Sequence, residues 1–317
     1  MPELALLLRP ALLAMAATIM SPCAAQAYPE KPIRMVVPFA PGGISDILAR
    51  MTAERITEML RQTVVVDNRG GASGNIGTAL VAGAAADGYT LLFVAPAFAT
   101  NVSLYSKPGY DPVKDFTPVA QVAGATNVLV TAPPTGIRSV KQLIDAASAR
   151  PGVLNYGSGG AGTSGQLATH VKMTHVAYKG AGPALTALLG NEVQLMFSPV
   201  ILVTPHVANG RLVALAVTSG ERSRAFPDVP TIAETAVQGF DVTSWFGVVA
   251  PAGTPRERVT LLHGAVVRAL KTREFADRLA AQGAEAVVRT PEGFGDYIRS
   301  EAGKWAGVIR QAGLKAQ

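Results

Sequence analysis

Short runs of apolar residues alternate along the chain with longer segments of helical spacing. In the first third, apolar runs at residues 33–37, 64–66 and 89–94 are separated by helical patterns at residues 45–60 and 75–84. Apolar runs of this length, bounded by glycine and proline, are typical of buried strands in a parallel sheet. Strands that alternate with helices in this way predict βαβ units and an α/β fold.

The alternation continues through the rest of the chain. Strands are predicted at residues 127–130 and 154–156, on either side of a helix over residues 139–149 that Ser139 caps. The pattern then repeats in a series of short segments at residues 175–177, 183–189, 193–197, 205–208 and 212–217. A final block predicts a strand at 246–249, a helix from 255, a strand at 286–288 and a helix over 291–311.

The N-terminal segment follows a different pattern. Arg9 precedes an apolar stretch at residues 11–20, and residues 25–27 (Ala-Gln-Ala) form a small-x-small sequence before Tyr28. This arrangement is typical of a secretory signal peptide, because the apolar stretch is too short to span a bilayer. We therefore expect residues 1–27 to be cleaved after Ala27 and the mature protein to be exported.

Composition narrows the function classes. The 317 residues include 28 Lys and Arg against 22 Asp and Glu, a net charge of +6, yet charged residues are only 16%. This excludes a disordered chain and a coiled coil, and the length favours about two domains. Aromatic residues make up 6% and are not interleaved with basic ones, so no nucleic-acid partner is expected. The one cysteine, Cys23, lies in the signal peptide, which excludes a disulfide framework.

Three glycine-rich turns follow predicted strands and open predicted helices. They cover residues 38–46, 68–75 and 156–164. Helix starts present unpaired N–H groups and the positive end of the dipole, so these turns suit a carboxylate or another oxyanion. The alternative is that they are ordinary helix-capping turns. The role of Asp46 also has two alternatives. It is either an acid favoured by the helix dipole or a side chain that fixes the loop by accepting hydrogen bonds from its backbone N–H groups.

Catalytic and cofactor motifs are incomplete. Residues 157–162 match the G-x-G-x-x-G dinucleotide fingerprint, but no acidic residue follows between Asp145 and Glu192 to hold a ribose. Ser164 lacks the spacing of a nucleophile elbow. The histidines have no metal-binding spacing and are interpreted as surface or packing residues: His170, His175, His206 and His263. We expect neither an enzyme nor a bound metal or cofactor.

A series of short motifs runs in order along the whole mature chain. The first reads YPEKPIRMVVPFAPGGISD over residues 28–46. The others lie at residues 66–77, 86–92, 110–116, 154–158, 162–164, 176–180, 215–219, 228–231 and 244–247. Together they resemble the Bug-type receptors, the extracytoplasmic solute-binding proteins of tripartite tricarboxylate transporters.

The resemblance implies a two-lobed α/β fold, the type II-like periplasmic binding protein, in which each lobe is a mostly parallel sheet flanked by helices. Lobe 1 is expected to comprise residues 28–126 and 247–317, and lobe 2 residues 127–246. The chain would cross between the lobes near residues 125–127 and 244–246.

The resemblance also implies a ligand site, because the two turns at residues 38–46 and 156–164 hold the ligand's carboxylate in such receptors. Carried over by position, the ligand-binding residues are Phe39, Ala40, Gly42, Gly43, Asp46, Ala97, Ser158, Gly159, Thr163, Ser164, Tyr178 and Gly180. The chain departs from the family pattern at three places. Gln166 replaces a common histidine, residues 167–173 form a shortened segment, and Ser198 replaces a common acid.

The function implied by the resemblance is capture of a small carboxylate-bearing metabolite and its delivery to the membrane subunits of a tripartite tricarboxylate-type transporter. A periplasmic monomer without a cofactor is expected. Two alternatives stay open. One is a ligand-sensing receptor for a membrane signalling partner, and the other is an exported α/β hydrolase using Ser158 or Ser164, for which the sequence supplies no base.

Overall fold

The protein is described here as a computed structural model, which covers residues 28–158, 173–178 and 180–312. Its large compact unit begins at Lys31. The expected signal peptide lies outside the described residues. Within the described ranges, no helix combines the length and the apolar character needed to cross a membrane.

The described strands form one continuous ten-stranded mixed sheet, in which a single long strand joins two parts. In the first half-sheet, β1 (Ile33–Val37) pairs in parallel with β2 (Val64–Asn68) and with β3 (Thr90–Val94). β9 (Thr243–Pro251) continues this half-sheet antiparallel to β3. The apolar run of β1 is buried almost throughout, as expected for a strand covered on both faces.

The second half-sheet also combines parallel and antiparallel pairs. β5 (Asn155–Ser158) pairs in parallel with β6 (Thr174–Ala177) and with β7 (Leu195–Pro199). β7 and β8 (Val213–Val217) both pair antiparallel with the long joining strand.

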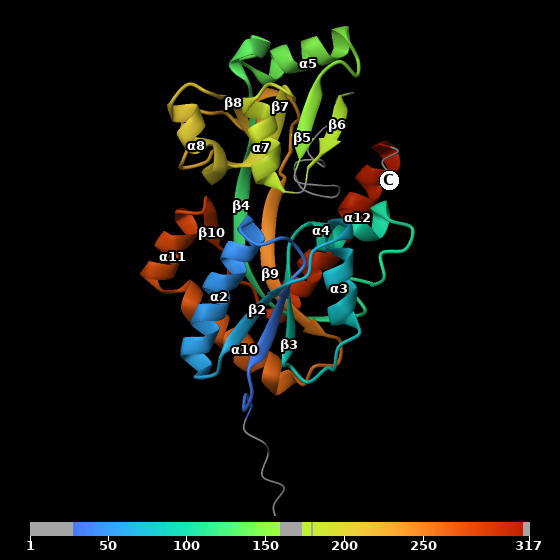
Figure 1. Cartoon of the computed structure of the whole chain (residues 1–317), viewed down its shortest axis with the longest axis vertical. Coiled ribbons are helices and arrows are strands. Elements are labelled where there is room, and N and C mark those ends of the chain that lie inside the picture. Colours follow the sequence, from blue (N-terminus) through green and yellow to red (C-terminus); the bar gives the residue numbers. More distant parts are fainter. Residues whose placement is uncertain (1–27, 159–172, 179, 313–317) are drawn as a thin grey trace, which may run out of the picture. The chain divides into compact units, whose positions relative to one another are not determined.

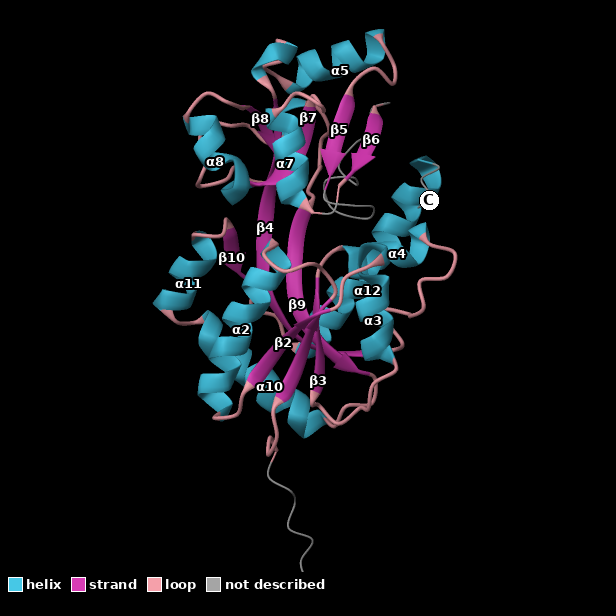
Figure 2. Cartoon of the chain, in the orientation of Figure 1, coloured by secondary structure: helices cyan, strands magenta, loops and turns pink. Residues whose placement is uncertain are grey.

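That joining strand is β4 (Phe116–Thr131), which passes from one half-sheet to the other (Figure 2). Its residues 116–126 pair with β9, and the short β10 (Ala284–Ala286) also pairs with this part of β4. From Asn127 onward β4 pairs with β7 and β8 instead. At the change of partners, Asn127 Nδ2 donates a hydrogen bond to Ser244 Oγ of β9 at 3.0 Å, and both residues are buried.

Helices flank both half-sheets. Figure 1 shows α2, α10 and α11 on one side of the first half-sheet and α3, α4 and α12 on the other. These helices are α2 (Ile44–Leu60), α3 (Asn75–Ala82), α4 (Ala97–Leu104), α10 (Arg256–Leu270), α11 (Arg273–Ala280) and α12 (Pro291–Ala312). The helices of the second half-sheet are α5 (Val140–Ala149), α7 (Ala181–Leu189), α8 (Val200–Ala208) and α9 (Ile232–Thr235). Single 3₁₀ turns lie at Ala72–Gly74 and Pro133–Thr135.

The second half-sheet has an apolar cluster on each face because successive strand residues point to opposite faces. Val128 and Val130 belong to a cluster with residues of α7 and α8. Leu129, between them, belongs to another cluster that includes Val140 of α5 and Ile232 of α9.

Helix α12 takes part in the cores of both half-sheets. Phe294 and Ile298 pack in a cluster with β1, β3 and β9 residues. Trp305 and Ile309, farther along the same helix, pack in the cluster that contains Leu129 of the second half-sheet. At 1.5 Å rise per residue, the 22 residues of α12 span about 33 Å, enough to reach both clusters.

The alternation of strands and helices predicted from the sequence is confirmed, as is the capping role of Ser139, whose Oγ accepts a hydrogen bond from Gln142 N. Several predicted element bounds were wrong, including those of β9, which covers Thr243–Pro251, and of α8, which begins at Val200. β2 extends to Asn68, β4 begins at Phe116, and β10 lies at Ala284–Ala286. Several helices were not predicted, namely α4, α9 and α11.

Candidate functional site

The loop between β1 and α2 leaves backbone N–H groups at a helix start. Gly42 has a φ of +83°, a left-handed conformation that glycine adopts without strain. Gly43 is the N-cap of α2, and within the described part of the chain no side chain caps this end of the helix. Because the first N–H groups of a helix have no intrahelical acceptor, this helix start suits an anion.

Asp46 fixes this loop from the first turn of α2. Its Oδ2 accepts a hydrogen bond from the Gly42 backbone N–H at 2.9 Å, and its Oδ1 accepts one from Asn68 Nδ2 at 3.0 Å. Asn68 Nδ2 also donates to the Phe39 carbonyl at 3.1 Å, so the end of β2 is tied to the loop. Arg50, one turn later, approaches Asp46 Oδ1 to 2.9 Å. Asp46 is thus both a first-turn acid and the side chain that fixes the loop.

The Asp46 carboxyl stays ionised although only 4% of the residue is exposed. Burial acts to raise its pKa, but the hydrogen bonds from Arg50, from the Gly42 amide and from Asn68 together hold the pKa below the usual value. Because the Arg50 guanidinium neutralises the carboxylate, Asp46 orders the loop without adding net negative charge beside an anion site.

The glycine-rich turn after β2 and the start of α3 pack closely against the start of the β1–α2 loop. A Cβ on Gly77 would lie 2.5 Å from the Arg69 carbonyl oxygen and 3.0 Å from Pro38 Cα. A Cβ on Gly74 would lie 3.3 Å from the Pro38 carbonyl oxygen. Glycine at positions 74 and 77 therefore allows this turn and the first turn of α3 to pack directly against Pro38, at the start of the β1–α2 loop.

Helix α4 is tied to the same turn. Asn101 Nδ2 donates hydrogen bonds to the Ser73 carbonyl at 3.0 Å and to Asn75 Oδ1 at 2.7 Å. The Tyr105 hydroxyl donates to Ser73 Oγ at 3.0 Å. Ala97 is buried at the start of α4. The three connections that follow β1, β2 and β3 therefore form one bonded group at the carboxyl ends of parallel strands, the usual place for a ligand in an α/β sheet.

A second group lies at the carboxyl end of β5. Ser158, the last residue of this strand, is fully buried, and its carbonyl accepts a hydrogen bond from the Tyr178 N–H at 2.9 Å. The Tyr178 ring lies 3.5 Å from the point where a Cβ of Gly157 would stand. Gly180, with a φ of +124°, is the N-cap of α7. Figure 1 shows β5 and β6 running toward the first half-sheet, while β1, β2 and β3 run toward the second.

His175 belongs to this second group, and its interpretation from the sequence as a surface or packing residue was incomplete. Its Nε2 lies 2.6 Å from Ser158 Oγ, and its ring stacks on Tyr156 with centroids 4.8 Å apart. Burial lowers the pKa of His175, so the imidazole is neutral at pH 7. The signal that sequence reasoning missed is the parallel pairing of β5 with β6, which brings residues of these separate segments side by side.

Some of the other predicted site residues lie together in the structure, and some lie outside the described residues. Phe39, Ala40, Gly42, Gly43 and Asp46 lie together in the β1–α2 loop and the first turn of α2. Gly159, Thr163 and Ser164 lie outside the described residues, as do Gln166 and residues 167–172.

Two further side chains that the sequence singled out have packing contacts. Ser198 is fully buried, and its hydroxyl donates to the Pro199 carbonyl at 3.2 Å. His263 Nδ1 lies 2.9 Å from the Val119 carbonyl, to which it donates. Within the described part of the chain, no group of three or more His, Cys, Asp or Glu side chains is placed to hold a metal ion.

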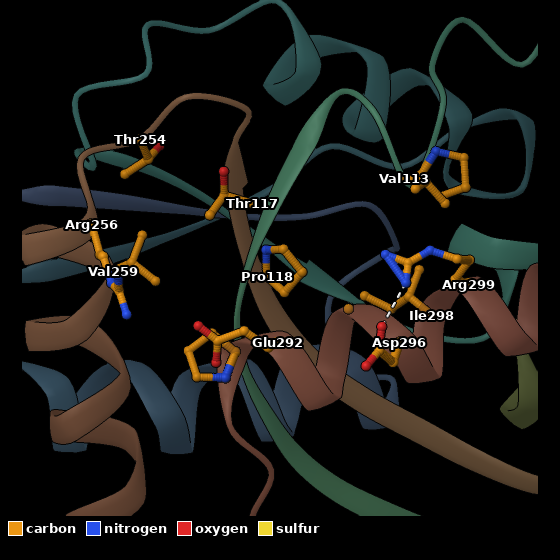
Figure 3. Close-up of a pocket in the computed structure, with 13 residues that line it drawn as sticks. Val113, Thr117, Pro118, Thr254, Arg256, Val259, Glu292, Asp296, Ile298 and Arg299 are labelled. Carbon is orange, nitrogen blue, oxygen red and sulfur yellow. Dashed lines mark hydrogen bonds and ion pairs between the residues drawn. The ribbon is translucent and has the colours of Figure 1, made fainter.

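A pocket of about 570 Å³ lies elsewhere on the first half-sheet, between the starts of α10 and α12 (Figure 3). Its wall includes an ion pair between Arg299 and Asp296, with an N–O distance of 2.6 Å. The lining residues are Pro112, Val113, Thr117, Pro118, Thr254, Arg256, Val259, Pro291, Glu292, Gly295, Asp296, Ile298 and Arg299. Since this lining contains none of the predicted ligand-binding residues, the pocket is separate from the candidate site.

Comparisons with known proteins bear on this site. The family described as "Tripartite tricarboxylate transporter family receptor" matches residues 48–314. Protein BugT of Bordetella pertussis is 39% identical over 308 residues, covering 94% of each chain.

Two solved structures from Rhodopseudomonas palustris are also similar to the chain. One, solved with adipate, has a TM-score of 0.84 and 38% identity, and the match covers 91% of this chain and 99% of that one. The other, MatC with bound malate, has a TM-score of 0.81 and 31% identity, over 89% of this chain and 100% of that one. These matches confirm the expected α/β periplasmic-binding-protein fold.

Proposed function

Because the chain belongs to the tripartite tricarboxylate transporter family of receptors, we propose that it is a periplasmic binding protein that captures a small carboxylate and delivers it to a tripartite transporter in the membrane. The family consists of receptors and not of enzymes. Similar chains solved with adipate and with malate support a carboxylate as the ligand. The signal-peptide pattern of residues 1–27 supports export.

The observation that carries the proposal is the ordered loop at the start of α2. The Gly42 and Gly43 backbones precede a 17-residue helix whose N-terminus has a glycine cap. The positive end of the helix dipole and the free N–H groups attract a carboxylate, and the loop is already fixed by Asp46 and Asn68 before a ligand arrives. Preorganisation of this kind reduces the entropy lost on binding.

The proposed site draws on both half-sheets. Phe39, Ala40, Gly42 and Gly43 would face the ligand from the β1–α2 loop, with Asp46 as the residue that positions them. Ala97 would contribute the start of α4. The proposed contacts from the second half-sheet are Ser158, Gly159, Thr163, Ser164, Tyr178 and Gly180. Hydroxyl and backbone donors dominate this set. They would bind the carboxylate group of a ligand but discriminate little between different molecules that carry such a group.

We also propose that the half-sheets correspond to two lobes, residues 28–126 with 247–317 and residues 127–246. The change of β4 partners between Thr126 and Asn127 supports the first crossing. The hydrogen bond from Asn127 to Ser244 connects it to the second crossing. Helix α12 contributes to both cores, so closure of the lobes would also involve this helix.

Thermal unfolding and titration calorimetry of the protein purified from the periplasm test this function. Malate, adipate, succinate and citrate are compared with the uncharged diamide of adipate as the matched control. A ligand at 100 times its Kd stabilises the folded state by about 2.7 kcal/mol, so a true ligand gives a clear rise in Tm. Failure of every mono-, di- and tricarboxylate in a broad screen to shift Tm or release heat would overturn the proposal.

A further inference from the structure

A histidine and a serine from neighbouring strands meet at the carboxyl end of the second half-sheet. In the parallel pairing of β5 with β6, His175 is level with Tyr156, and Ser158 is level with Ala177. Side chains two residues apart on a strand lie on the same face, so Tyr156 and Ser158 share a face of β5. The imidazole stacks on the Tyr156 ring and reaches along the strand to Ser158, where Nε2 and Oγ are 2.6 Å apart.

The imidazole is held firmly in this position. Tyr156 is itself buried in the cluster that contains Leu129 and Leu195, so the surface on which His175 stacks is fixed. Ser158 is fully buried, and its carbonyl is bonded to the Tyr178 N–H. A hydrogen bond between two groups held in this way has a defined geometry, and the tautomer of His175 decides which of the two groups donates.

The ring nitrogen of His175 that carries the proton determines whether the Ser158 hydroxyl can donate a hydrogen bond to an anion. If neutral His175 carries its proton on Nδ1, its Nε2 accepts and the single hydroxyl proton of Ser158 points at the ring. If the proton is on Nε2, this nitrogen donates to Ser158 Oγ and the hydroxyl proton can be directed at another acceptor. A carboxylate only accepts hydrogen bonds, so it is compatible with the second arrangement and disfavours the first.

We propose that His175 is a positioning residue of the carboxylate site, which donates from Nε2 to Ser158 Oγ in the ligand-bound protein and thereby turns the serine hydroxyl toward the carboxylate. This inference rests on the proposed function, because it takes Ser158 as a ligand contact. His175 lies outside the set of ligand-binding residues that the family resemblance implies. Its hydrogen bond to Ser158 also provides a reason for selectivity, because a ligand group that can only donate hydrogen bonds would favour the opposite proton arrangement.

The test compares two substitutions at position 175. His175→Phe keeps an aromatic ring to stack on Tyr156 but removes both nitrogens, whereas His175→Gln retains an amide that can donate at a similar reach. One neutral hydrogen bond contributes about 1 kcal/mol, so the Phe variant should bind dicarboxylate about fivefold more weakly in calorimetry. The Gln variant should stay within about threefold of the wild type. His206→Phe, on α8, is the matched control and should bind like the wild type.

A spectroscopic measurement on the wild type separates positioning from a merely structural role. Imidazole ¹⁵N NMR distinguishes protonated from unprotonated ring nitrogens, and saturating dicarboxylate should leave His175 with a protonated Nε2. An unprotonated Nε2 in the bound state, or wild-type affinity in His175→Phe, would overturn this inference while leaving carboxylate binding intact. If the wild type binds no carboxylate at all, the proposed function fails and the inference fails with it.

Discussion

The carboxylate of Asp46 accepts a hydrogen bond from the Gly42 backbone N–H at 2.9 Å, across the start of helix α2. A buried acid therefore sets the conformation of the loop that precedes the helix. The acid is itself neutralised by Arg50 and bonded to Asn68, so three segments of the first half-sheet depend on one side chain. The consequences of removing its charge are measurable.

Asp46→Asn should destabilise the protein by about 2–4 kcal/mol, because an amide NH₂ would face groups that are already donors and Arg50 would lose its partner. Urea unfolding measures the change. The matched control is Asp145→Asn on α5, where the pair with Lys141 is exposed and the expected change is within about 0.5 kcal/mol. Equal effects of the two substitutions would show that the Asp46 contacts contribute no more to the free energy of unfolding than an exposed ion pair does.

The contribution of Asp46 should depend on pH. Its folded-state pKa is lowered, so the stabilisation is fully present above the unfolded value of about 3.9 and is lost as pH falls through the folded value. The difference in unfolding free energy between wild type and Asp46→Asn should therefore be constant from pH 7 to 5 and shrink toward pH 3. A difference that grows on acidification would contradict the assigned sign.

Gly77→Ala tests the close packing behind the loop. The added methyl would stand 2.5 Å from the Arg69 carbonyl oxygen and 3.0 Å from Pro38 Cα, so the start of α3 must move away from both, at a cost of about 1–3 kcal/mol. Gly303→Ala in α12 is the control, because a Cβ there meets no atom within 4 Å and alanine favours a helix by about 0.5–1 kcal/mol. The two variants should shift Tm in opposite directions. Stabilisation by both would mean that the approach to Pro38 is not tight.

The two tryptophans provide another matched pair. Trp305 Nε1 donates to Glu301 Oε2 at 2.9 Å, whereas Trp245 Nε1 has no hydrogen-bond partner among the described residues. Both residues are almost fully buried, at 3% and 1% exposed. Trp305→Phe should therefore cost about 1–2 kcal/mol more in unfolding free energy than Trp245→Phe. A larger loss for Trp245→Phe would indicate that its Nε1 makes an interaction with a part of the chain outside the described residues.

Local sequence predicts much of this fold, and its failures have specific causes. β3 was predicted from its uninterrupted run Leu91–Val94, and β1 from a run in which Arg34 is the single charged residue. β2 was predicted too short because Asp67 is charged, a residue that the structure accommodates by ion pairs with Arg34 and Arg69. The predicted strand began only at Asn127, whereas β4 begins at Phe116. Proline cannot donate to a strand ladder, and β4 accommodates Pro118 with an irregularity in register between Pro118 and Ala120.

In the candidate site too, local sequence predicts one part and not the other. The glycine and proline pattern of residues 38–43 locates the loop, because such residues are needed where a backbone turns sharply before a helix. The groups that fix it, Asn68 for the loop and His175 for Ser158, come from neighbouring strands. Their roles depend on strand pairing between segments distant in sequence, which composition and periodicity do not supply.

The central claim is that the β1–α2 loop holds the ligand's carboxylate. Amide ¹H–¹⁵N NMR during titration with malate or adipate tests it most directly, because the Gly42 and Gly43 resonances report on their own N–H groups. At Gly43 and the first residues of α2 we expect saturable shifts that are among the largest in the spectrum and that are absent with the diamide of adipate. Saturable binding that leaves these resonances unmoved would contradict it.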